Sequence, residues 1–522
     1  MELNKIYNMD ALNGLKHVET ESIDAIVSDP PYQLDSINKR FGKEGSAEAQ
    51  YGNDGSFQRL TKGFMNKEWD VLPSVELLKE CLRVLKSGAF SMWLMTPRQD
   101  SQLEFLLRLR EAGFVISFTP VYWNYLTGFP KAQNISKMVD KKLGYNEEVV
   151  GKGRSGAKET HHVMNMAYEE GKTSSLMGGE YSITKPVSDE AKRLDKSFSG
   201  FQPKPAVEVI IVAMKPLSEK SYVEQALKNK HGVTWLGNCR IPYESDSDFK
   251  KRKRGKLKSP PRGRNGIYGT DRNGGIVDTD LYLDKNGRFP ANLLVSDNVL
   301  DIKSDGALAP VKSGQKGFGG NIYGKYKTGG DDGRTFYSDM ETDKSVSRYF
   351  SLDAWWDKKI KELPLDVQKT FPFIYVPKAS KTERNIGLDK LPEKNREGTA
   401  TNSPDETGKF PEHDIRRTKN IHPTVKPIKL MSYLITLTTQ ENDIVLDPFM
   451  GSGTTAISSF VLNRRFIGFE RENEYFDIAN ARIDFYTSRK VLFEMVKIKE
   501  EIIPTKKNIN SIGMFLESED GN

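Results

Sequence analysis

Apolar positions along the chain fall alternately into short buried runs and into helical stripes. The run from Ile23 to Val27 stops at Ser28 and is followed by two prolines, so we expect a buried strand that leads into a loop. After Ser74, apolar residues recur at helical spacing until Gly88, which we expect to end the helix. The next expected elements are a strand over 90–95, a helix over 101–110 and a strand region over 114–125. This alternation predicts an α/β fold with a parallel, doubly wound sheet.

The alternation breaks after residue 125 and resumes near residue 417. A polar stretch over 151–177 is expected to be a mobile loop, and a strand returns over 207–214. Between 216 and about 416 glycine and proline are frequent and strands look short. Beyond it we expect a helix over 427–438, a strand over 443–446, a helix over 453–462, a strand over 466–469 and a helix over 472–486.

The sheet is therefore expected to be built from both ends of the chain. We predict four regions, namely 1–215 as the N-terminal part of a catalytic domain with a polar loop about 140–200, 216–416 as an insertion, 417–489 as the C-terminal part, and 490–522 as a weakly ordered tail. A length of 522 residues fits two or three domains, and 37% hydrophobic residues can form a core.

Composition excludes several classes of protein. No apolar run has the length of a membrane span, and the first residues lack a signal-peptide pattern. Cys81 and Cys239 lie far apart without zinc spacing, so we expect reduced thiols and a cytoplasmic protein. His161 and His162 lack supporting ligands nearby in sequence, so we expect no metal site.

One candidate for ligand binding is a Gly-rich turn in the C-terminal part. It reads Asp447-Pro448-Phe449-Met450-Gly451-Ser452-Gly453-Thr454-Thr455 and joins a buried strand to a helix. Glycines allow a tight turn and close approach of a ligand, and the free N–H groups of a helix start favour a negative group. Glu470 ends the next strand, where a carboxylate can accept hydrogen bonds from ribose hydroxyls.

This layout suits an adenosine-containing cofactor, but it does not identify which one. The spacing Gly451-x-Gly453-x-x-Ala456 also satisfies the loose fingerprint of nicotinamide or flavin dinucleotides. A Gly-rich connection without a ligand is the third interpretation. The choice between S-adenosylmethionine and a dinucleotide depends on the N-terminal motif.

That motif is Asp29-Pro30-Pro31-Tyr32, at the end of a buried strand, where α/β active sites lie. The Asp29 carboxylate and the Pro30 carbonyl can accept both hydrogens of an exocyclic amine, which directs its lone pair toward an electrophilic methyl group. Pro31 helps to fix the loop, and Tyr32 offers a face on which a flipped base can stack. The structural alternative is a rigid Pro-Pro turn with an aspartate cap.

The two motifs together resemble motifs IV and I of the DNA amino-methyltransferases, which act on adenine N6 or cytosine N4. The order, with the catalytic motif first, resembles the permuted β group, in which a target-recognition region separates the two motifs. Residues 422–427 resemble that group's motif X, which helps to hold the methionine end of the cofactor. Asp10, in the segment 8–12, resembles an acidic position that contacts the cofactor adenine. Further segments, at 128–132, 204–208, 288–292 and 378–381, resemble phage-type and mobile-element members.

This resemblance implies a permuted, Rossmann-like, seven-stranded methyltransferase sheet, with the two motifs on adjacent strands and an inserted target-recognition domain. It implies S-adenosylmethionine as cofactor and double-stranded DNA as substrate. The implied catalytic residues are Asp29, Pro30, Pro31 and Tyr32. The implied cofactor-binding residues are Asp10, Thr424, Lys426, Asp447, Phe449, Gly451, Ser452, Gly453, Thr454 and Glu470.

Three functions are weighed against one another. Adenine N6 is favoured as the target because aspartate is the commoner first residue of the motif for adenine, whereas cytosine-N4 enzymes often carry serine. A nicotinamide-dependent oxidoreductase has no use for the tetrad at 29–32. A silent DNA-binding regulator would be expected to have lost part of it. The recognition sequence, the oligomeric state and pairing with a cognate restriction endonuclease stay open.

A basic run in the insertion offers a candidate DNA contact. It comprises Lys250, Lys251, Arg252, Lys253 and Arg254, and continues through four more basic residues to 264 without an acidic residue. A solvated surface loop explains the same composition. If the protein binds DNA, the functional interpretation of this basic run is contact with DNA phosphates.

Overall fold

The computed structural model describes residues 1–33, 70–125, 134–146, 148–154, 180–199, 206–243, 245–250, 256–258, 276–278, 284–296, 349–363, 379, 381–395 and 417–502. The predicted His161–His162 pair and most of the predicted basic run lie outside them.

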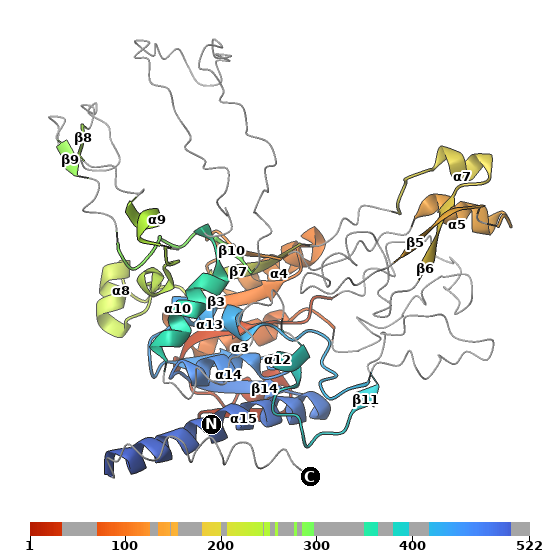
Figure 1. Cartoon of the computed structure of the whole chain (residues 1–522). Coiled ribbons are helices and arrows are strands. Elements are labelled where there is room, and N and C mark those ends of the chain that lie inside the picture. Colours follow the sequence, from red (N-terminus) through yellow and green to blue (C-terminus); the bar gives the residue numbers. More distant parts are fainter. Residues whose placement is uncertain are drawn as a thin grey trace.

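The largest element is an eight-stranded sheet with the order β1-β14-β13-β2-β3-β7-β4-β10 (Figure 1). Strand β7 is antiparallel to both of its neighbours, and the other paired strands are parallel. The predicted α/β class with a mostly parallel sheet is therefore confirmed. The bounds are β1 Lys5–Asn8, β2 Ile23–Ser28, β3 Leu85–Met95, β4 Val121–Asn124, β7 Val207–Met214, β10 Leu293–Val295, β13 Ile444–Asp447 and β14 Arg465–Glu470.

The two ends of the chain meet inside this sheet. Strand β13 pairs in parallel with β2, with Val445 opposite Ala25 and Leu446 opposite Ile26. The two predicted motifs therefore follow adjacent strands at the same edge, as the resemblance implied. The strand count differs from the implied seven because β10, from within 216–416, pairs with β4 and extends the sheet.

Helices cover both faces of the sheet. One face carries α1 (Ala11–Leu15), α3 (Val75–Val84) and α4 (Gln99–Ala112), and the other carries α10 (Leu352–Glu362), α13 (Ile428–Thr438), α14 (Thr454–Val461) and α15 (Asn473–Ile502). Strand alternation separates the two cores, because Met92 and Leu94 of β3 join the α13 side while Trp93 and Met95 join the α3 side.

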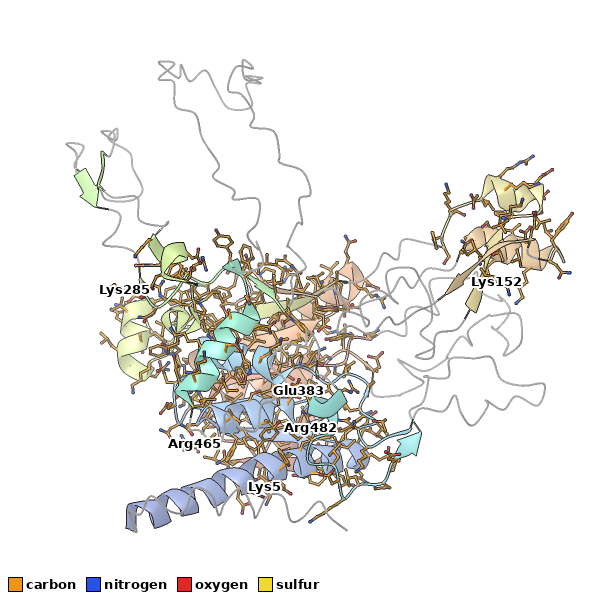
Figure 2. All side chains as sticks on the ribbon, in the orientation of Figure 1. Lys5, Lys152, Lys285, Glu383, Arg465 and Arg482 are labelled. Carbon is orange, nitrogen blue, oxygen red and sulfur yellow. The ribbon has the colours of Figure 1, made fainter. Side chains whose placement is uncertain are left out.

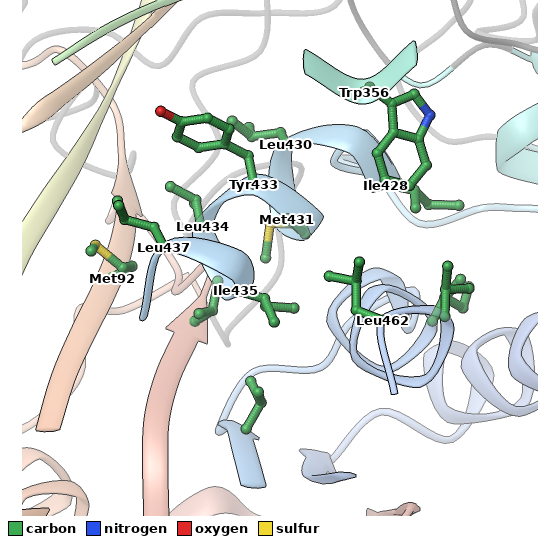
Figure 3. Packing of buried hydrophobic residues seen from close by; sticks show 14 of the residues in the cluster. Met92, Trp356, Ile428, Leu430, Met431, Tyr433, Leu434, Ile435, Leu437 and Leu462 are labelled. Atoms are coloured by element: carbon green, nitrogen blue, oxygen red, sulfur yellow. The ribbon is translucent and has the colours of Figure 1, made fainter. Parts of the chain in front are cut away.

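Helix α13 is buried on all sides. All of its residues are buried, which fits a helix that lies between the sheet and two other helices. Figure 3 shows Leu437 beside Met92 of β3 and Ile428 below Trp356 of α10. This packing fixes the position of the residues that immediately precede α13, which matter for the site.

Three expectations about element boundaries are wrong. Helix α3 ends at Val84, and Gly88, which was expected to end it, lies inside β3 with φ +80°. Gly88 packs against Gly232, and a Cβ on Gly88 would come within 2.8 Å of the Gly232 backbone nitrogen. Helix α15 continues to Ile502, beyond the predicted start of the tail at 490. Residues near 140–200 are not all loop.

That last region forms a small unit, at the right of Figure 1. Strand β5 (Glu148–Arg154) pairs antiparallel with β6 (Glu180–Lys185), and α5 (Ile135–Lys142) packs on α7 (Asp189–Arg193). Asp140 ties the two helices together, because its carboxylate accepts hydrogen bonds from the backbone N–H groups of Val187 and Ser188. Of the stretch 151–177 expected to be a mobile loop, only 151–154 is described.

Of the described parts of 216–416, β10 joins the main sheet and α10 packs against α13, whereas β8 (Lys256–Lys258) and β9 (Ile276–Asp278) pair only with each other, away from the sheet in Figure 1. These parts also include α8 (Tyr222–Asn229), η2 (Leu236–Cys239), α9 (Asp246–Lys250), α12 (Lys381–Asn385) and β11 (Lys394–Asn395), which pairs with β12 (Arg417–Thr418). Trp355 of α10 packs edge-on against Tyr433 of α13. The predicted boundaries of the insertion stay a prediction.

Cys81 and Cys239 are both buried and unbridged, and burial raises the pKa of each thiol. None of the helices in the described ranges is long and apolar enough to span a membrane.

Candidate active site

The tetrad begins where β2 ends, at the carboxyl edge of the sheet. Asp29 follows Ser28, the last residue of β2, and its side chain is 16% exposed. The Tyr32 hydroxyl donates a hydrogen bond of 2.6 Å to Asp29 Oδ1. The aspartate and the tyrosine therefore act as one hydrogen-bonded unit, with the buried Pro30 between them.

A second aspartate fastens the loop after the tetrad. Asp70 Oδ1 accepts hydrogen bonds from the backbone N–H groups of Tyr32, at 3.1 Å, and Gln33, at 3.0 Å. Asp70 is almost fully buried, so these bonds are shielded from water. Sequence reasoning missed this residue, since an isolated aspartate in a polar stretch gives no signal of its distant partners.

Lys426 lies directly against the tetrad. Its Nζ is 3.1 Å from Asp29 Oδ2 and 2.9 Å from Glu208 Oε2, and it donates a hydrogen bond of 2.9 Å to the Tyr32 hydroxyl. The ammonium group lies 5.3 Å from the centre of the Tyr32 ring, at its hydroxyl end. The Tyr125 hydroxyl donates to Glu208 Oε1 at 3.3 Å.

Burial and charge set the protonation of this cluster. Burial raises the pKa of Asp29, the Lys426 ammonium opposes that rise, and the Glu208 carboxylate adds to it. Burial would lower the pKa of Lys426, but Asp29 and Glu208 outweigh it and raise the pKa, so the side chain stays an ammonium. Burial raises the pKa of Tyr32 well above its usual value, and the Asp29 and Glu208 carboxylates raise it further.

Glu470, at the end of β14, contacts the Gly-rich turn. Its Oε2 accepts a hydrogen bond of 2.8 Å from the Gly451 N–H, and its Oε1 accepts one of 2.9 Å from Glu472 N–H. Burial raises its pKa to about 7, against the effect of those two donors. Asp10 lies nearby in the fold, since Asn8 of β1 pairs with Glu470, but its carboxylate caps α1 by accepting from Leu12 N–H and Asn13 N–H.

Asp447 connects the two motifs. Its Oδ1 accepts from the Ser28 hydroxyl at 2.6 Å and from Phe449 N–H at 3.0 Å, while Oδ2 accepts from the Thr455 hydroxyl at 2.6 Å. Burial raises its pKa to about 6 despite these donors. Because Ser28 immediately precedes Asp29, this carboxylate ties the tetrad strand to the Gly-rich turn.

The Gly-rich turn needs its glycines for reasons of packing. Gly451 has φ +54°, and a Cβ there would come within 2.7 Å of the His422 imidazole. Gly453 has φ +81° and lies against Ala479 of α15, where a Cβ would meet three atoms at 3.1 Å. The close approach that the sequence suggested is thus made by the protein itself at both positions.

The carbonyl of Ser452 is anchored from the far side of the turn. It accepts a hydrogen bond from the buried Arg482 guanidinium, which also reaches the backbone carbonyl of Glu383. Figure 2 shows the labelled residues Arg482, on α15, and Glu383, on α12, close together. The Glu383 carboxylate in turn accepts from Ile428 N–H at the start of α13, and Arg384 donates to the His422 carbonyl. Sequence reasoning missed all three charged residues.

The remaining predicted site residues fall in several environments. Thr424 is exposed, Phe449 is half-buried, and Ser452 and Thr454 are buried beside Arg482. Lys250 is exposed at the end of α9, whereas Lys251, Arg252, Lys253 and Arg254 lie outside the described residues. In the described part of the chain, no group of three or more metal-ligating side chains converges.

The residues around the turn fit an adenosine-containing cofactor. Helix α14 starts at Gly453 without a side-chain cap among the described residues, so its first N–H groups are available to a negative group. Each oxygen of Glu470 accepts a hydrogen bond from a backbone N–H and can accept another, as ribose hydroxyls would require. Asp29 directly follows the adjacent strand β2, at the same edge of the sheet.

Comparison with known proteins supports the resemblance. Residues 303–481 match the N6_N4_Mtase family model, described as DNA methylase. The chain is 51% identical over 65 residues to the Type II methyltransferase M.HindIII of Haemophilus influenzae, covering 12% of this chain and 21% of the relative. It is 40% identical over 105 residues to the Type II methyltransferase M.BglI of Bacillus subtilis, covering 19% of this chain and 30% of the relative.

The chain thus spans less than a third of the length of these relatives. Among solved structures, the PvuII DNA methyltransferase (cytosine-N4-specific) covers 93% of this chain and 92% of its own at 12% identity, with a TM-score of 0.33, too low to relate the two further. The family-model match, over 303–481, is to a DNA methylase of the N6/N4 type, as the resemblance of the sequence motifs led us to expect.

Proposed function

We propose that this chain is a DNA amino-methyltransferase that uses S-adenosylmethionine and methylates N6 of adenine in double-stranded DNA. One observation carries the proposal: the buried Asp29 carboxylate follows β2, and the Gly-rich turn follows β13, the adjacent parallel strand. An acceptor for an amine and a turn suited to an adenosine cofactor therefore share one edge of the sheet. A nicotinamide-dependent oxidoreductase would have no role for the Asp29 cluster.

The roles of the chain's residues follow from their contacts. Asp29 and the Pro30 carbonyl would accept the two hydrogens of the target amine and turn its lone pair out of the ring plane. The base must leave the duplex to reach them, at a cost of a few kcal/mol in lost pairing and stacking, and would stack on the Tyr32 ring. S-adenosylmethionine, when bound, supplies an electrophilic methyl group on a sulfonium.

The cofactor would be held by the turn and by the strand end beside it. Glu470 would accept the ribose hydroxyls, and the start of α14 would receive a negative group. We retain Asp10, Thr424, Asp447, Phe449, Gly451, Ser452, Gly453 and Thr454 as proposed cofactor-site residues. Among them Asp447 acts through the turn, because its oxygens already accept bonds from Ser28, Phe449 and Thr455.

The choice of adenine rests on aspartate, rather than serine, at position 29. Methylation at cytosine C5 is disfavoured because that reaction needs a nucleophilic thiolate, and burial raises the pKa of both Cys81 and Cys239.

The product decides between these targets. Unmethylated genomic DNA is incubated with the purified chain and S-adenosylmethionine, digested to nucleosides and analysed by mass spectrometry. N6-methyladenine is the expected product. N4-methylcytosine would keep the amine chemistry and refute the base, whereas 5-methylcytosine, or no methylated nucleoside, would refute the proposal.

A further inference from the structure

Strand β7 brings an unpredicted carboxylate to the tetrad. Because β7 runs antiparallel to β3 and β4, its first residues lie at the edge where the parallel strands end. Glu208 is the second residue of β7 and pairs with Trp123, near the end of β4. It therefore lies at the same edge as Asp29.

Lys426 joins this carboxylate to Asp29. Its Nζ is 2.9 Å from Glu208 Oε2 and 3.1 Å from Asp29 Oδ2. The side chain of Lys426 is 8% exposed, that of Glu208 14% and that of Asp29 16%. In such a poorly solvated place, a carboxylate without a cation tends to take up a proton. Lys426 places one ammonium between the two carboxylates and offsets their negative charge.

The arrangement leaves Asp29 able to accept an amine. A carboxylate has about four lone-pair sites. Of these, the Tyr32 hydroxyl uses one on Oδ1, and Lys426 uses one on Oδ2. These two contacts hold the plane of the carboxylate while leaving acceptor capacity for the target amine.

Glu208 itself is held from both sides. Its Oε1 accepts from the Tyr125 hydroxyl at 3.3 Å, and its Oε2 faces Lys426. Lys426 is fixed in turn by the buried helix α13, which starts two residues later. The chain Tyr125–Glu208–Lys426–Asp29 thus connects β4, β7 and α13 to the tetrad.

We propose that Lys426 and Glu208 are positioning residues for Asp29, an inference that rests on the proposed function. Lys426 fixes Asp29 Oδ2 and balances its charge. Glu208 holds the Lys426 side chain in place through their ion pair, and its negative charge balances part of the Lys426 positive charge. This role differs from binding the methionine end of the cofactor, which the resemblance implied for Lys426.

The test uses Lys426→Met, Glu208→Gln and the double variant in the full chain. Methyl transfer from labelled S-adenosylmethionine to unmethylated genomic DNA is measured in single turnovers at saturating cofactor and DNA, between pH 6 and 9. Cofactor affinity is measured separately by calorimetry. We expect Lys426→Met to slow transfer by about a hundredfold and Glu208→Gln by about tenfold, with cofactor affinity changed less than about threefold.

Two further results are specific to the proposal. Lys426→Met should move the acid limb of the rate–pH profile to higher pH, because Asp29 then faces the Glu208 carboxylate, Asp447 and the hydroxyls of Tyr32 and Tyr125 without a cation. Adding Glu208→Gln removes one of the two carboxylates, so the double variant should be faster than Lys426→Met and its acid limb should return toward that of the wild type.

A buried ion pair on the same helix provides the matched control. Lys429 of α13 pairs with Asp353 of α10. Lys429→Met and Asp353→Asn should lower stability to a similar extent but change the saturated transfer rate by less than about twofold.

Three outcomes would overturn the inference. A cofactor affinity lowered at least tenfold by Lys426→Met would make Lys426 a cofactor ligand. An unshifted acid limb without rescue in the double variant would leave only a structural role. If Lys426→Met does not fold, full activity in Glu208→Gln, which keeps the side-chain shape, would refute it. A wild-type chain that transfers no methyl group would instead refute the proposed function itself.

Discussion

Glu470 allows a quantitative test of the cofactor site through its protonation. Burial raises the pKa of this carboxyl from 4.5 to about 7 in the folded chain. Its folded pKa therefore exceeds its unfolded pKa, so the folded state binds more protons between these two values. Ionised Glu470 destabilises the fold, and this cost appears as pH rises from about 4.5 to about 7.

The size of the effect follows from the shift. At 1.36 kcal/mol per pKa unit, a rise from 4.5 to about 7 corresponds to about 3 kcal/mol at pH 8 and to almost nothing at pH 4. Glu470→Gln cannot ionise, so it removes this pH dependence. The substitution also gives up one acceptor for Gly451 N–H or Glu472 N–H, which costs about 1–3 kcal/mol at every pH.

The informative quantity is thus the difference between variant and wild type as pH changes. Equilibrium urea unfolding without cofactor, at pH 4, 6, 7 and 8, should show the free energy of unfolding of Glu470→Gln improving relative to wild type by about 3 kcal/mol across that range. Glu474→Gln, at an exposed position of α15, is the control for the general effect of removing a carboxylate.

The same substitution should act in the opposite direction on ligand binding. Wild-type affinity for S-adenosylmethionine should fall below about pH 7 as Glu470 takes up its proton, whereas the variant should bind about 1–3 kcal/mol more weakly at pH 8 with a flatter profile. A stability difference that does not change with pH would refute the buried, ionisable carboxyl. Unchanged affinity in calorimetry would refute its role in the cofactor site.

Three other outcomes are expected. Asp29→Ala should slow methyl transfer by about a hundredfold or more while calorimetry shows nearly unchanged cofactor binding, and full activity would remove Asp29 from the mechanism. Gly451→Val should abolish cofactor binding, because the new side chain meets the His422 imidazole and must adopt φ +54°; wild-type affinity would contradict the turn geometry. Neutralising Lys250, Lys251, Arg252, Lys253 and Arg254 together should weaken DNA binding about equally across sequences and flatten its salt dependence by about one unit of slope per lost phosphate contact, and an unchanged slope in a binding titration would mean that the run is only a solvated loop.

Local sequence patterns determined the elements that carry the chemistry. The apolar run before Asp29 and the one before Asp447 are short and end in loop residues, so both strands and their ends could be predicted. A helix was predicted over 101–110, and α4 spans Gln99–Ala112, with Gly113 ending it at φ 104°. Such patterns work because helix and strand periodicity are properties of neighbouring residues.

Local sequence patterns were misleading where a glycine or a run of charged residues is compatible with more than one structure. Gly88 suggested a helix end, but its conformational freedom serves contact with Gly232 inside a strand. The lysine-rich stretch after 490 suggested disorder, yet no glycine or proline interrupts the chain before Pro504, and the helix reaches Ile502. A tertiary contact decided the conformation of Gly88, and the lack of a helix-breaking residue decided the length of α15.

Only the tertiary structure decided which distant side chains meet at the site. Lys426 reaches Tyr32 across 394 positions of sequence, and Ser28 reaches Asp447 across 419. The pairing of Glu208 with Lys426 could not be predicted, because nothing in the sequence around a single glutamate in an apolar strand indicates which cation it will contact. Periodicity fixes which residues are buried, whereas the pairing of buried charges depends on strand order and direction, here on the antiparallel course of β7.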